Sequence, residues 1–310
     1  MKVLFVSSGN SDFFEIAPFI KSQGESLKKI GVDLDYFTIK GKGIRGYLRN
    51  IPHLRKKIKD GGYDLVHAHY SLSAIVTSLA TSRTVIVSLM GSDVQGSSFW
   101  RFVIRLYSSF KWREIIVKSE EMRQKIKIRR AHVIPNGVDL EVFNNLDKEE
   151  CKEKLNLEKE KNYILFAADP DRKVKNYPLA EKSCSQLITH NSQLITLGKT
   201  PHEKIPLYLN ACDVLILTSL WEGSPNIIKE AMACNCPIVS TDVGDVRWLL
   251  GDIEGHYIAK HDPQDFAEKI KLALYFGKKT KGRERIIELG LDSESVARRV
   301  LEVYKKSIEL

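Results

Sequence analysis

The segment DVLILTSLWEGSPNIIKEAMACNCPIVST, residues 213–241, decides the fold class of this chain. It starts with an apolar, β-branched run that is typical of a buried strand, and it breaks at a turn of small residues. A helical stretch, NIIKEAMAC, comes next, and a second apolar run, CPIVST, follows it. A strand, a helix and a further strand in this order predict a βαβ unit, which belongs to a parallel sheet covered by helices.

Apolar, strand-like runs alternate with helical stretches almost from one end of the chain to the other. The runs before residue 144 are KVLFVSS, DLDYFTI, DLVHAHY, TVIVSLM, EIIVKS and HVIP. After a polar stretch at residues 144–162, the pattern restarts with YILFAA, SQLITLG, DVLILTS, CPIVST and HYIAK. Two such series predict two doubly wound, Rossmann-like α/β domains, at residues 1–158 and 159–290, because 310 residues are too many for one core.

The remaining residues, 291–310, predict a separate amphipathic helix. Its apolar residues are spaced so that they fall on one helical face: Val296, Val300, Val303, Tyr304 and Ile308. An apolar face of this kind has to cover another part of the protein. We expect this C-terminal crossover helix to pack back on the first domain.

The composition is that of an ordinary soluble globular protein, with 43% apolar and 28% charged residues. No apolar run approaches the roughly 20 residues that cross a bilayer, and the apolar run at the N-terminus is too short for a signal peptide. Five cysteines, an odd number, suit a reducing compartment. We therefore expect a cytoplasmic protein, and we expect no metal at Cys234 and Cys236, because they lack a second pair at zinc spacing.

The chain is basic, with 48 basic and 39 acidic residues and a net charge of +9. A positive field favours an anionic partner, which could be a nucleotide, a nucleic acid or the anionic surface of a membrane. Charge alone does not choose among these partners. Each basic cluster is equally well explained as a solvated helix face.

The turn inside the opening segment has the features of an anion-binding site. Ser224 is a good N-cap, and Pro225 suits the first helical position because it lacks an N–H donor. The free N–H groups and the positive dipole end of a helix that starts here favour a phosphate. Gly223 has no side chain, so a ligand can approach the backbone closely.

Two glutamates, Glu222 and Glu230, lie on either side of this helix start. Phosphate repels a carboxylate, whereas hydroxyl groups donate strong hydrogen bonds to it. The order glutamate, helix start, glutamate therefore matches a nucleotide-sugar, which has hydroxyls at both ends and a diphosphate in the middle. The alternative is an ordinary helix with one solvated glutamate and one glutamate near its cap.

At these residues the chain resembles the retaining glycosyltransferases of family 4, which have the GT-B fold and an E-x7-E motif. That motif reads EGSPNIIKE here. The resemblance extends to DLVHAHYSLSA, SLMGSD, VIPNGVDLEVF and IPLYLNACDVLILTSLWEGSPN. It implies a hexosyltransferase in which two Rossmann-like domains face each other across a cleft, the first binding the acceptor and the second the nucleotide-sugar.

The resemblance also implies roles for the residues around the motif. Glu230 would bind the ribose, and Glu222 would contact the transferred sugar. The backbone from Gly223 to Asn226 would bind the hydroxyls of that sugar and the diphosphate.

The family further places an arginine and a lysine after the first strand of the second domain, where they neutralise the departing diphosphate. Lys175 fits the lysine. The usual Gly-Arg is replaced by Ala168 and Asp169, so Arg172 is the nearest candidate for the arginine. No D-x-D stands where a catalytic metal would be expected, and we expect neither a metal nor another cofactor.

In the first domain the resemblance points to His69, which matches the family's cleft-facing histidine better than His67 does. We expect His67 and Tyr70 to lie on the opposite side of the strand from His69. A histidine in a strand is more often a packed core residue than a catalytic one, and that alternative stays open.

Two more residues of the first domain are candidates for substrate contact. Asp93 follows a predicted strand and either contacts the acceptor or caps the next helix. Met90 stands where many relatives have a histidine, so a polar contact there is lost or replaced. Of the Gly-Gly usual after the first strand only Gly9 is kept, which still leaves room for a phosphate or an acceptor near the backbone.

These features predict a retaining glycosyltransferase that moves a sugar from a nucleotide-diphosphate sugar to a glycan, lipid-linked or small-molecule acceptor, in cell-surface polysaccharide or glycoconjugate synthesis. We expect same-face attack, with His69 positioning a substrate. The alternatives are a binding module of the same fold without turnover and a basic nucleic-acid-binding protein, which we do not favour because no basic-aromatic motif is present. The basic first domain would also suit peripheral contact with the anionic inner face of a membrane.

Overall fold

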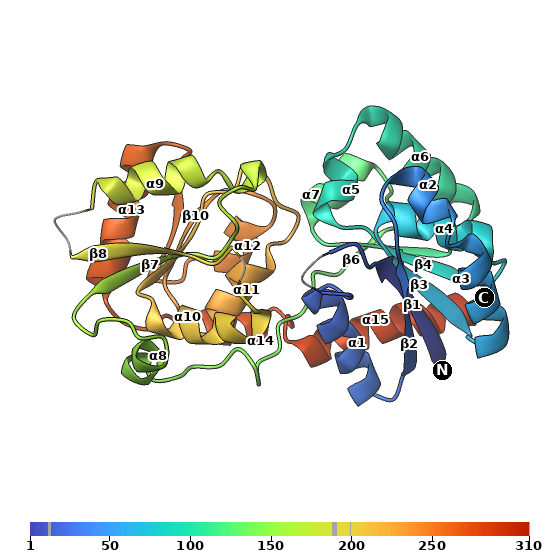
Figure 1. Ribbon diagram of the computed structural model, residues 1–310, viewed down its shortest axis with the longest axis horizontal. Helices are drawn as coiled ribbons and strands as arrows, with labels where there is room; N and C mark the ends of the chain where they lie inside the picture. Colours follow the sequence, from blue (N-terminus) through green and yellow to red (C-terminus); the bar gives the residue numbers. More distant parts are fainter. Residues whose placement is uncertain (12–13, 188–190, 199, 310) are drawn as a thin grey trace. The chain divides into compact units, whose positions relative to one another are not determined.

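The computed structural model describes residues 1–11, 14–187, 191–198 and 200–309. The chain divides into two compact units. The first unit consists of Met1–Gly137 together with Ser293–Leu310, and the second consists of Val138–Asp292. Figure 1 shows both units as sheets covered by helices. No helix among the described residues is both long enough and apolar enough to span a bilayer.

The first unit contains a six-stranded parallel sheet with the order β2-β1-β3-β4-β5-β6. Its strands are β1 (Lys2–Ser8), β2 (Asp33–Ile39), β3 (Leu65–His69), β4 (Val85–Ser88), β5 (Glu114–Val117) and β6 (His132–Val133). The central strands β3 and β4 are buried along their whole length, which explains their almost continuous apolar runs. Each of the six runs predicted as strands in this part of the chain contributes one strand.

Helices cover both faces of this sheet, and the C-terminal helix is one of them (Figure 1). The helices are α1 (Pro18–Lys29), α2 (Gly43–Leu48), α3 (Ile51–Gly61), α4 (Ser71–Ala80), α5 (Gly91–Gln95), α6 (Ser98–Phe110), α7 (Glu120–Ile126) and α15 (Ser293–Ile308). Helix α15 packs beside α1. The expected return of the C-terminal helix to the first domain is therefore confirmed.

The apolar face predicted for α15 is buried at four of its five positions, namely Val296, Val300, Val303 and Tyr304, whereas Ile308 near the chain end is exposed. The Tyr304 hydroxyl reaches the sheet, where it lies 2.6 Å from Nδ1 of His67. This buried hydrogen bond joins residues 237 positions apart in the sequence and fixes α15 on the strands.

The second unit contains a five-stranded parallel sheet with the order β11-β10-β9-β7-β8. Its strands are β7 (Asn162–Phe166), β8 (Ser192–Thr196), β9 (Val214–Leu217), β10 (Ile238–Thr241) and β11 (His256–Ala259). Its helices are α8 (Lys148–Lys154), α9 (Tyr177–Ser185), α10 (Ile205–Ala211), α11 (Asn226–Ala233), α12 (Val246–Leu250), α13 (Pro263–Phe276) and α14 (Gly282–Glu288), and η1 (Lys173–Lys175) and η3 (His202–Lys204) are short 3-10 turns. Two doubly wound parallel sheets are present, as predicted.

The segment 138–158 was assigned to the first domain from the sequence, and its contacts place it in the second unit. The side chain of Asn210 explains this difference, because its amide accepts a hydrogen bond from the Leu146 N–H and donates one to the Asn144 carbonyl. Lys148 also pairs with Asp213 at 2.5 Å. These contacts tie the segment to α10 and to the start of β9.

Both sheets change winding direction at one point, between β1 and β3 in the first unit and between β7 and β9 in the second. Ligands of open parallel sheets bind outside the carboxyl ends of the strands at this switch point. The loops that leave β1, β7 and β9 carry Gly9, Lys175 and Glu222, and His69 is the last residue of β3. The sheet order therefore brings candidate residues from distant parts of the sequence to one edge of each sheet.

Gly9 has a packing role at this edge. Its N–H donates to the carbonyl of Ile39, and a Cβ on it would lie 2.8 Å from Cβ of Thr38. Real side chains do not approach that closely. The absence of a side chain at Gly9 therefore allows the loop after β1 to lie against the end of β2.

Replacing Tyr304 with phenylalanine should destabilise the first unit by about 1–3 kcal/mol, because Nδ1 of His67 would remain buried without its partner. The measurement is urea unfolding followed by circular dichroism. Tyr275→Phe is the matched control, because the Tyr275 side chain is 93% exposed. Equal unfolding midpoints for both variants would show that the Tyr304 hydroxyl does not hold α15 in place.

Candidate functional site

The switch point of the second sheet is occupied by an ion pair between Lys175 and Glu222. The Lys175 Nζ donates to Oε1 of Glu222 at 2.6 Å, and Oγ of Ser219 donates to the same oxygen at 2.8 Å. The two charged side chains are only 13% and 16% exposed. Because the pair is largely removed from water, removing one partner would leave an uncompensated charge.

The two loops that carry this pair are also joined through their backbones. The Leu220 N–H donates to the Val174 carbonyl at 2.9 Å. The Thr218 hydroxyl donates to the Lys175 carbonyl at 2.7 Å. The loops after β7 and β9 therefore form one connected structure, and the positions of the lysine and the glutamate are fixed before any ligand binds.

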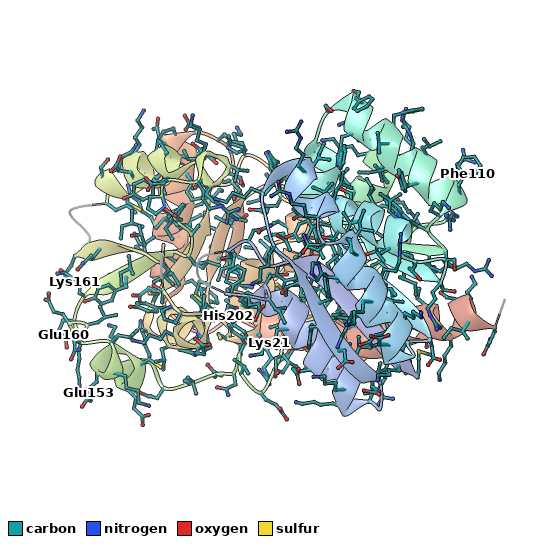
Figure 2. The ribbon with its side chains drawn as sticks, turned by 45° about the vertical axis from the view of Figure 1, so that its right-hand side comes forward. Lys21, Phe110, Glu153, Glu160, Lys161 and His202 are labelled. Carbon is teal, nitrogen blue, oxygen red and sulfur yellow. The ribbon has the colours of Figure 1, made fainter. Side chains whose placement is uncertain are left out.

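The second glutamate of the motif, Glu230, lies on α11 and contacts His202 from the turn η3. Nε2 of His202 and Oε1 of Glu230 are 3.2 Å apart, and the His202 ring packs edge-on against Phe143. The hydrogen bond to Glu230 raises the pKa of His202 above its usual value, although burial opposes this shift. Figure 2 labels His202 in the second unit. His202 has no motif around it, so the sequence alone does not mark it as a site residue.

The helix of the motif starts later than predicted. Helix α11 begins at Asn226, with Pro225 in the N-cap position, and no side chain caps it. The prediction of Ser224 as the N-cap was therefore wrong; its hydroxyl instead accepts a hydrogen bond from Nζ of Lys229 at 3.1 Å. The N-cap position therefore supplies no side-chain acceptor to the first turn of α11.

Gly223 lies at the centre of this turn and is buried against a second loop. A Cβ on Gly244 would lie 2.6 Å from the Gly223 carbonyl oxygen and 3.1 Å from that of Glu222. Gly244 also has a positive φ of 59°, which a larger residue would rarely adopt. The loop after β10 thus packs closely against the backbone of Glu222 and Gly223.

Lys229 is a buried cation in the first half of α11. Burial lowers the pKa of Lys229 to about 8, although the charges of Asp245 and Glu230 act in the opposite direction. A lysine with this pKa is mostly protonated at neutral pH. In the sequence, Lys229 appears only as a single lysine within the largely apolar run NIIKEAMAC, and no role was predicted for it.

Arg172, the candidate for the missing family arginine, is exposed at the residue before η1. Lys175, three residues later, has a largely buried side chain. Both residues lie between β7 and α9. Lys175 is thus built into the site, whereas Arg172 lies at its surface.

In the first unit, His67 and His69 lie on the same face of β3, and their rings stack with centroids 4.4 Å apart. The expectation that they lie on opposite faces was wrong, because side chains two positions apart in a strand point the same way. His67 is satisfied, with Tyr304 on Nδ1 and the Ser88 hydroxyl 2.9 Å from Nε2. Neither ring nitrogen of His69 has a hydrogen-bond partner in the described part of the chain.

His69 is completely buried, and burial together with the charges of His67 and Lys118 holds its pKa well below the usual value. It is therefore neutral at pH 7. The next residue, Tyr70, has the backbone angles φ 73° and ψ 147°, which a non-glycine residue rarely adopts. A strained turn beside a buried histidine without a partner is a feature that is concentrated at functional sites.

Asp93 is buried and makes structural contacts. Its carboxylate accepts hydrogen bonds from the N–H groups of Ser71 and Met90, at 2.9 Å and 2.7 Å, and from the Ser71 hydroxyl. Burial raises the pKa of Asp93, although these hydrogen bonds oppose the shift. The contacts favour the capping alternative for Asp93, since they join the start of α5 to the start of α4.

Neither a hollow in the second unit nor a cluster of metal-ligating side chains offers an alternative site among the described residues. A hollow of about 500 Å³ in the second unit is lined by Asp213 and Pro237, which precede β9 and β10. It therefore lies at the amino ends of these strands, away from the edge where ligands of such sheets bind. Among the described residues there is no group of three or more metal-ligating side chains close enough to hold an ion.

Two family models match the chain. The model described as Glycosyltransferase Family 4 matches residues 6–142, and the model described as Glycosyl transferases group 1 matches residues 161–275. The first match falls mostly within the first unit, and the second falls within the second unit. Together they account for most of both sheets.

Curated relatives are identical to this chain at about a quarter of the aligned residues. It is 26% identical over 235 residues to TuaC of Bacillus subtilis, a glycosyltransferase whose name assigns it to teichuronic acid biosynthesis, covering 67% of this chain and 60% of that protein. It is 27% identical over 269 residues to a UDP-Gal:alpha-D-GlcNAc-diphosphoundecaprenol alpha-1,3-galactosyltransferase of Escherichia coli, covering 71% and 68%. The chain thus spans less than two thirds of the first relative's length and slightly more than two thirds of the second's.

Solved structures show the same fold at low sequence identity. Sucrose-phosphate synthase from Thermosynechococcus elongatus has a TM-score of 0.77 at 18% identity, with 98% of each chain covered. HepE from Anabaena in complex with UDP-glucose has a TM-score of 0.74 at 16% identity, with 99% of this chain and 100% of that chain covered. The predicted fold class, GT-B with two doubly wound domains, is confirmed.

Replacing Glu230 with glutamine should lower the pKa of His202 below its usual value, because the partner that raises it is lost while burial remains. A group with a raised pKa contributes stability below its unfolded pKa of about 6.5 and loses it as the pH rises through the folded value. The stability lost in this variant should accordingly be larger at pH 6 than at pH 8.5. NMR titration of His202 checks the pKa, and urea unfolding at both pH values checks the stability.

The matched control for this titration is Glu203→Gln, which removes the carboxylate next to His202 in the sequence. The charge of Glu203 raises the pKa of His202 less than Glu230 does. This variant should therefore lower the pKa only slightly. Equal shifts in both variants would mean that the contact between His202 and Glu230 is not what holds the ring.

Proposed function

Because the chain belongs to the group 1 glycosyltransferases, we propose that it moves a hexosyl group from a nucleotide-diphosphate sugar to an acceptor, with retention of configuration. The acceptor is a glycan or a lipid-linked sugar in the synthesis of a cell-surface polysaccharide. The enzyme class predicted from the sequence, a hexosyltransferase-type glycosyltransferase, is confirmed at the level of the family. The donor, the acceptor and the stereochemistry are the new parts of this proposal.

One observation carries the proposal, namely the position of Lys175, Glu222 and the start of α11 at the switch point of the second sheet. A lysine there can neutralise a diphosphate, and the backbone N–H groups of Gly223, Ser224 and Asn226 can bind its oxygens. The two glutamates of the motif then accept hydrogen bonds from hydroxyls, with Glu222 on the transferred sugar and Glu230 on the ribose. The ligand that fits these groups has hydroxyls on both sides of a diphosphate.

Lys175 and Lys229 are the cations that would stabilise the leaving diphosphate. Charge builds up on that group as the bond to the sugar breaks, and fixed cations in a partly desolvated site stabilise it. Lys175 is held by its ion pair with Glu222. The Lys229 Nζ lies 3.1 Å from the Ser224 hydroxyl, just before the start of α11. Lys229 compensates in part for the absent Gly-Arg, together with Arg172 at the surface.

The relatives support uridine diphosphate sugars as the first donors to test. HepE was solved in complex with UDP-glucose, and the Escherichia coli relative is named for UDP-Gal and a diphosphoundecaprenol-linked acceptor. The name of the Bacillus subtilis relative refers to teichuronic acid, a further cell-surface polymer. These names favour a lipid-diphosphate acceptor for this chain as well.

Retention would result from attack on the face that the diphosphate leaves, with a diphosphate oxygen accepting the proton of the acceptor. The neutral His69 can take part only by donating or accepting a hydrogen bond, because its low pKa prevents it from carrying a charge at pH 7. We therefore assign His69 a positioning role. Gly9 and Asp93 have the packing and capping contacts described above, and their contact with substrate remains a prediction.

A second candidate function is nucleotide-sugar binding without turnover. The observation that favours it is the exposed position of Arg172 together with the replacement of the family's Gly-Arg by Ala168 and Asp169. A protein of this kind would bind the donor at the same groups and release no product.

The proposed function is tested by thermal shift against a panel of nucleoside diphosphates, followed by transfer assays with the matching nucleotide-sugars and a diphosphate-linked acceptor. A nucleotide at about 100 times its dissociation constant adds about 2.7 kcal/mol of stability. Glu230→Ala should weaken nucleotide binding by about 1.5–3 kcal/mol, and Glu203→Ala should not. Donor binding without transfer or hydrolysis would favour the binding module, and no nucleotide binding at all would refute both functions.

Replacing Lys175 with glutamine should reduce kcat by about 10²–10³-fold, as expected for the loss of one fixed group that stabilises transition-state charge. Lys173→Gln is the matched control, because Lys173 lies exposed in the same turn, and it should keep nearly full activity. Lys175→Arg should restore part of the loss. Equal activity of the two glutamine variants, with unchanged thermal midpoints, would remove Lys175 from the mechanism.

A further inference from the structure

Helix α6 of the first unit has large apolar side chains on two faces. Its inner face packs on the core through Ile104, which is fully buried, and through the partly buried Trp100 and Tyr107. A helix on the surface of a protein normally carries polar residues on its outer face. The outer face of α6 carries three phenylalanines and a leucine instead.

These four outer residues are strongly exposed: Phe99 is 72%, Phe102 55%, Leu106 46% and Phe110 77% exposed. At 100° per residue they fall within an arc of about 80°, so they form one continuous stripe along the helix. Three of the four exposed phenylalanines of the described chain lie on this stripe. Figure 2 labels Phe110 at the end of the helix, on the outside of the unit.

The surroundings of the stripe are basic. Residues 96–113 contain four basic residues, Arg101, Arg105, Lys111 and Arg113, and no acidic residue. The adjoining loop adds Arg130. Its guanidinium donates to the carbonyls of Trp112 and Arg113, just after the end of α6. An exposed aromatic stripe is thus bordered by positive charge.

We propose that α6 is a membrane-docking helix, which inserts the side chains of Phe99, Phe102, Leu106 and Phe110 into the interface of an anionic lipid bilayer. Aromatic and leucine side chains on one face with lysine and arginine beside them are the features of helices that lie in the plane of a membrane interface. Anionic headgroups complement the charge of Arg105, Lys111 and Arg113, and each basic residue near such a surface adds attraction.

The charge distinguishes this occupant from a second copy of the chain. Two copies packed through this helix would bring eight like charges of residues 96–113 together without an acidic partner from the same segment. An anionic bilayer gains from the same charges. Helix α6 belongs to the first unit, whereas the residues proposed for donor binding belong to the second, so membrane docking is a property separate from transfer.

Cosedimentation with two kinds of vesicles tests the proposal, one of phosphatidylcholine alone and one of equal parts phosphatidylcholine and phosphatidylglycerol. The wild-type protein should pellet with the anionic vesicles and stay in the supernatant with the neutral ones, and added salt should weaken its binding. Phe102→Ser combined with Phe110→Ser should weaken binding at least about tenfold, because two apolar side chains no longer insert. The control Tyr275→Ser removes an even more exposed aromatic residue from α13 and should bind like the wild type.

A second pair of variants tests the charges. Lys111→Gln combined with Arg113→Gln should weaken binding to the anionic vesicles about tenfold. The control Lys305→Gln combined with Lys306→Gln removes the same charge from the exposed last turn of α15 and should have a much smaller effect. All variants change exposed residues and should keep the wild-type thermal midpoint and nucleotide affinity.

Two results would overturn the proposal. One is wild-type protein that binds neutral and anionic vesicles equally, or a phenylalanine variant that binds anionic vesicles as well as the wild type does. The other is a wild-type dimer in size-exclusion chromatography that the phenylalanine variant dissolves, with no vesicle binding, because a second copy would then cover the helix. Neither result would affect the proposed transfer reaction, which is measured with nucleotide and acceptor in the absence of vesicles.

Discussion

The ion pair between Lys175 and Glu222 is the contact on which the rest of the site depends. It exists because the sheet order places β7 beside β9, so that loops 47 residues apart at this pair meet at one edge. A backbone hydrogen bond between the same loops holds the two side chains in place. Both side chains are largely shielded from water, which strengthens their electrostatic interactions. A sheet in which another strand separated β7 from β9 would have the same motif without this site.

The architecture could be predicted because the strands are short, apolar and regularly separated by helical stretches. Buried parallel strands have to be apolar along their whole length, and runs such as DVLILTS and CPIVST show this directly. The domain boundary was less predictable, since residues 138–158 are held in the second unit by the side chain of Asn210 rather than by a regular pattern. The N-cap at Ser224 failed for a related reason, because Lys229 occupies its hydroxyl.

The candidate residues were predictable as a set, and their partners were not. Glu222, Glu230 and Lys175 belong to motifs, whereas His202 is a single residue whose importance comes from its contact with Glu230, 28 positions away in the sequence. The two histidines of β3 illustrate the point. They are equivalent in the sequence and stack on the same face, yet only the structure shows that Tyr304 and Ser88 satisfy His67 while His69 has no partner among the described residues.

Under the proposed function, the charges of the second unit would favour a nucleotide-sugar over a simple anion. Each cation has an acidic side chain acting on it, Glu222 on Lys175 and Asp245 on Lys229, so the charge of each lysine is already offset in part before a ligand binds. A plain phosphate could use the cations only by competing with these carboxylates, which would repel it. A ligand that also offers hydroxyls gives the carboxylates new partners while its diphosphate takes the cations and the start of α11. In the proposed function, the acidic residues would thereby select for a ligand that combines sugar and diphosphate.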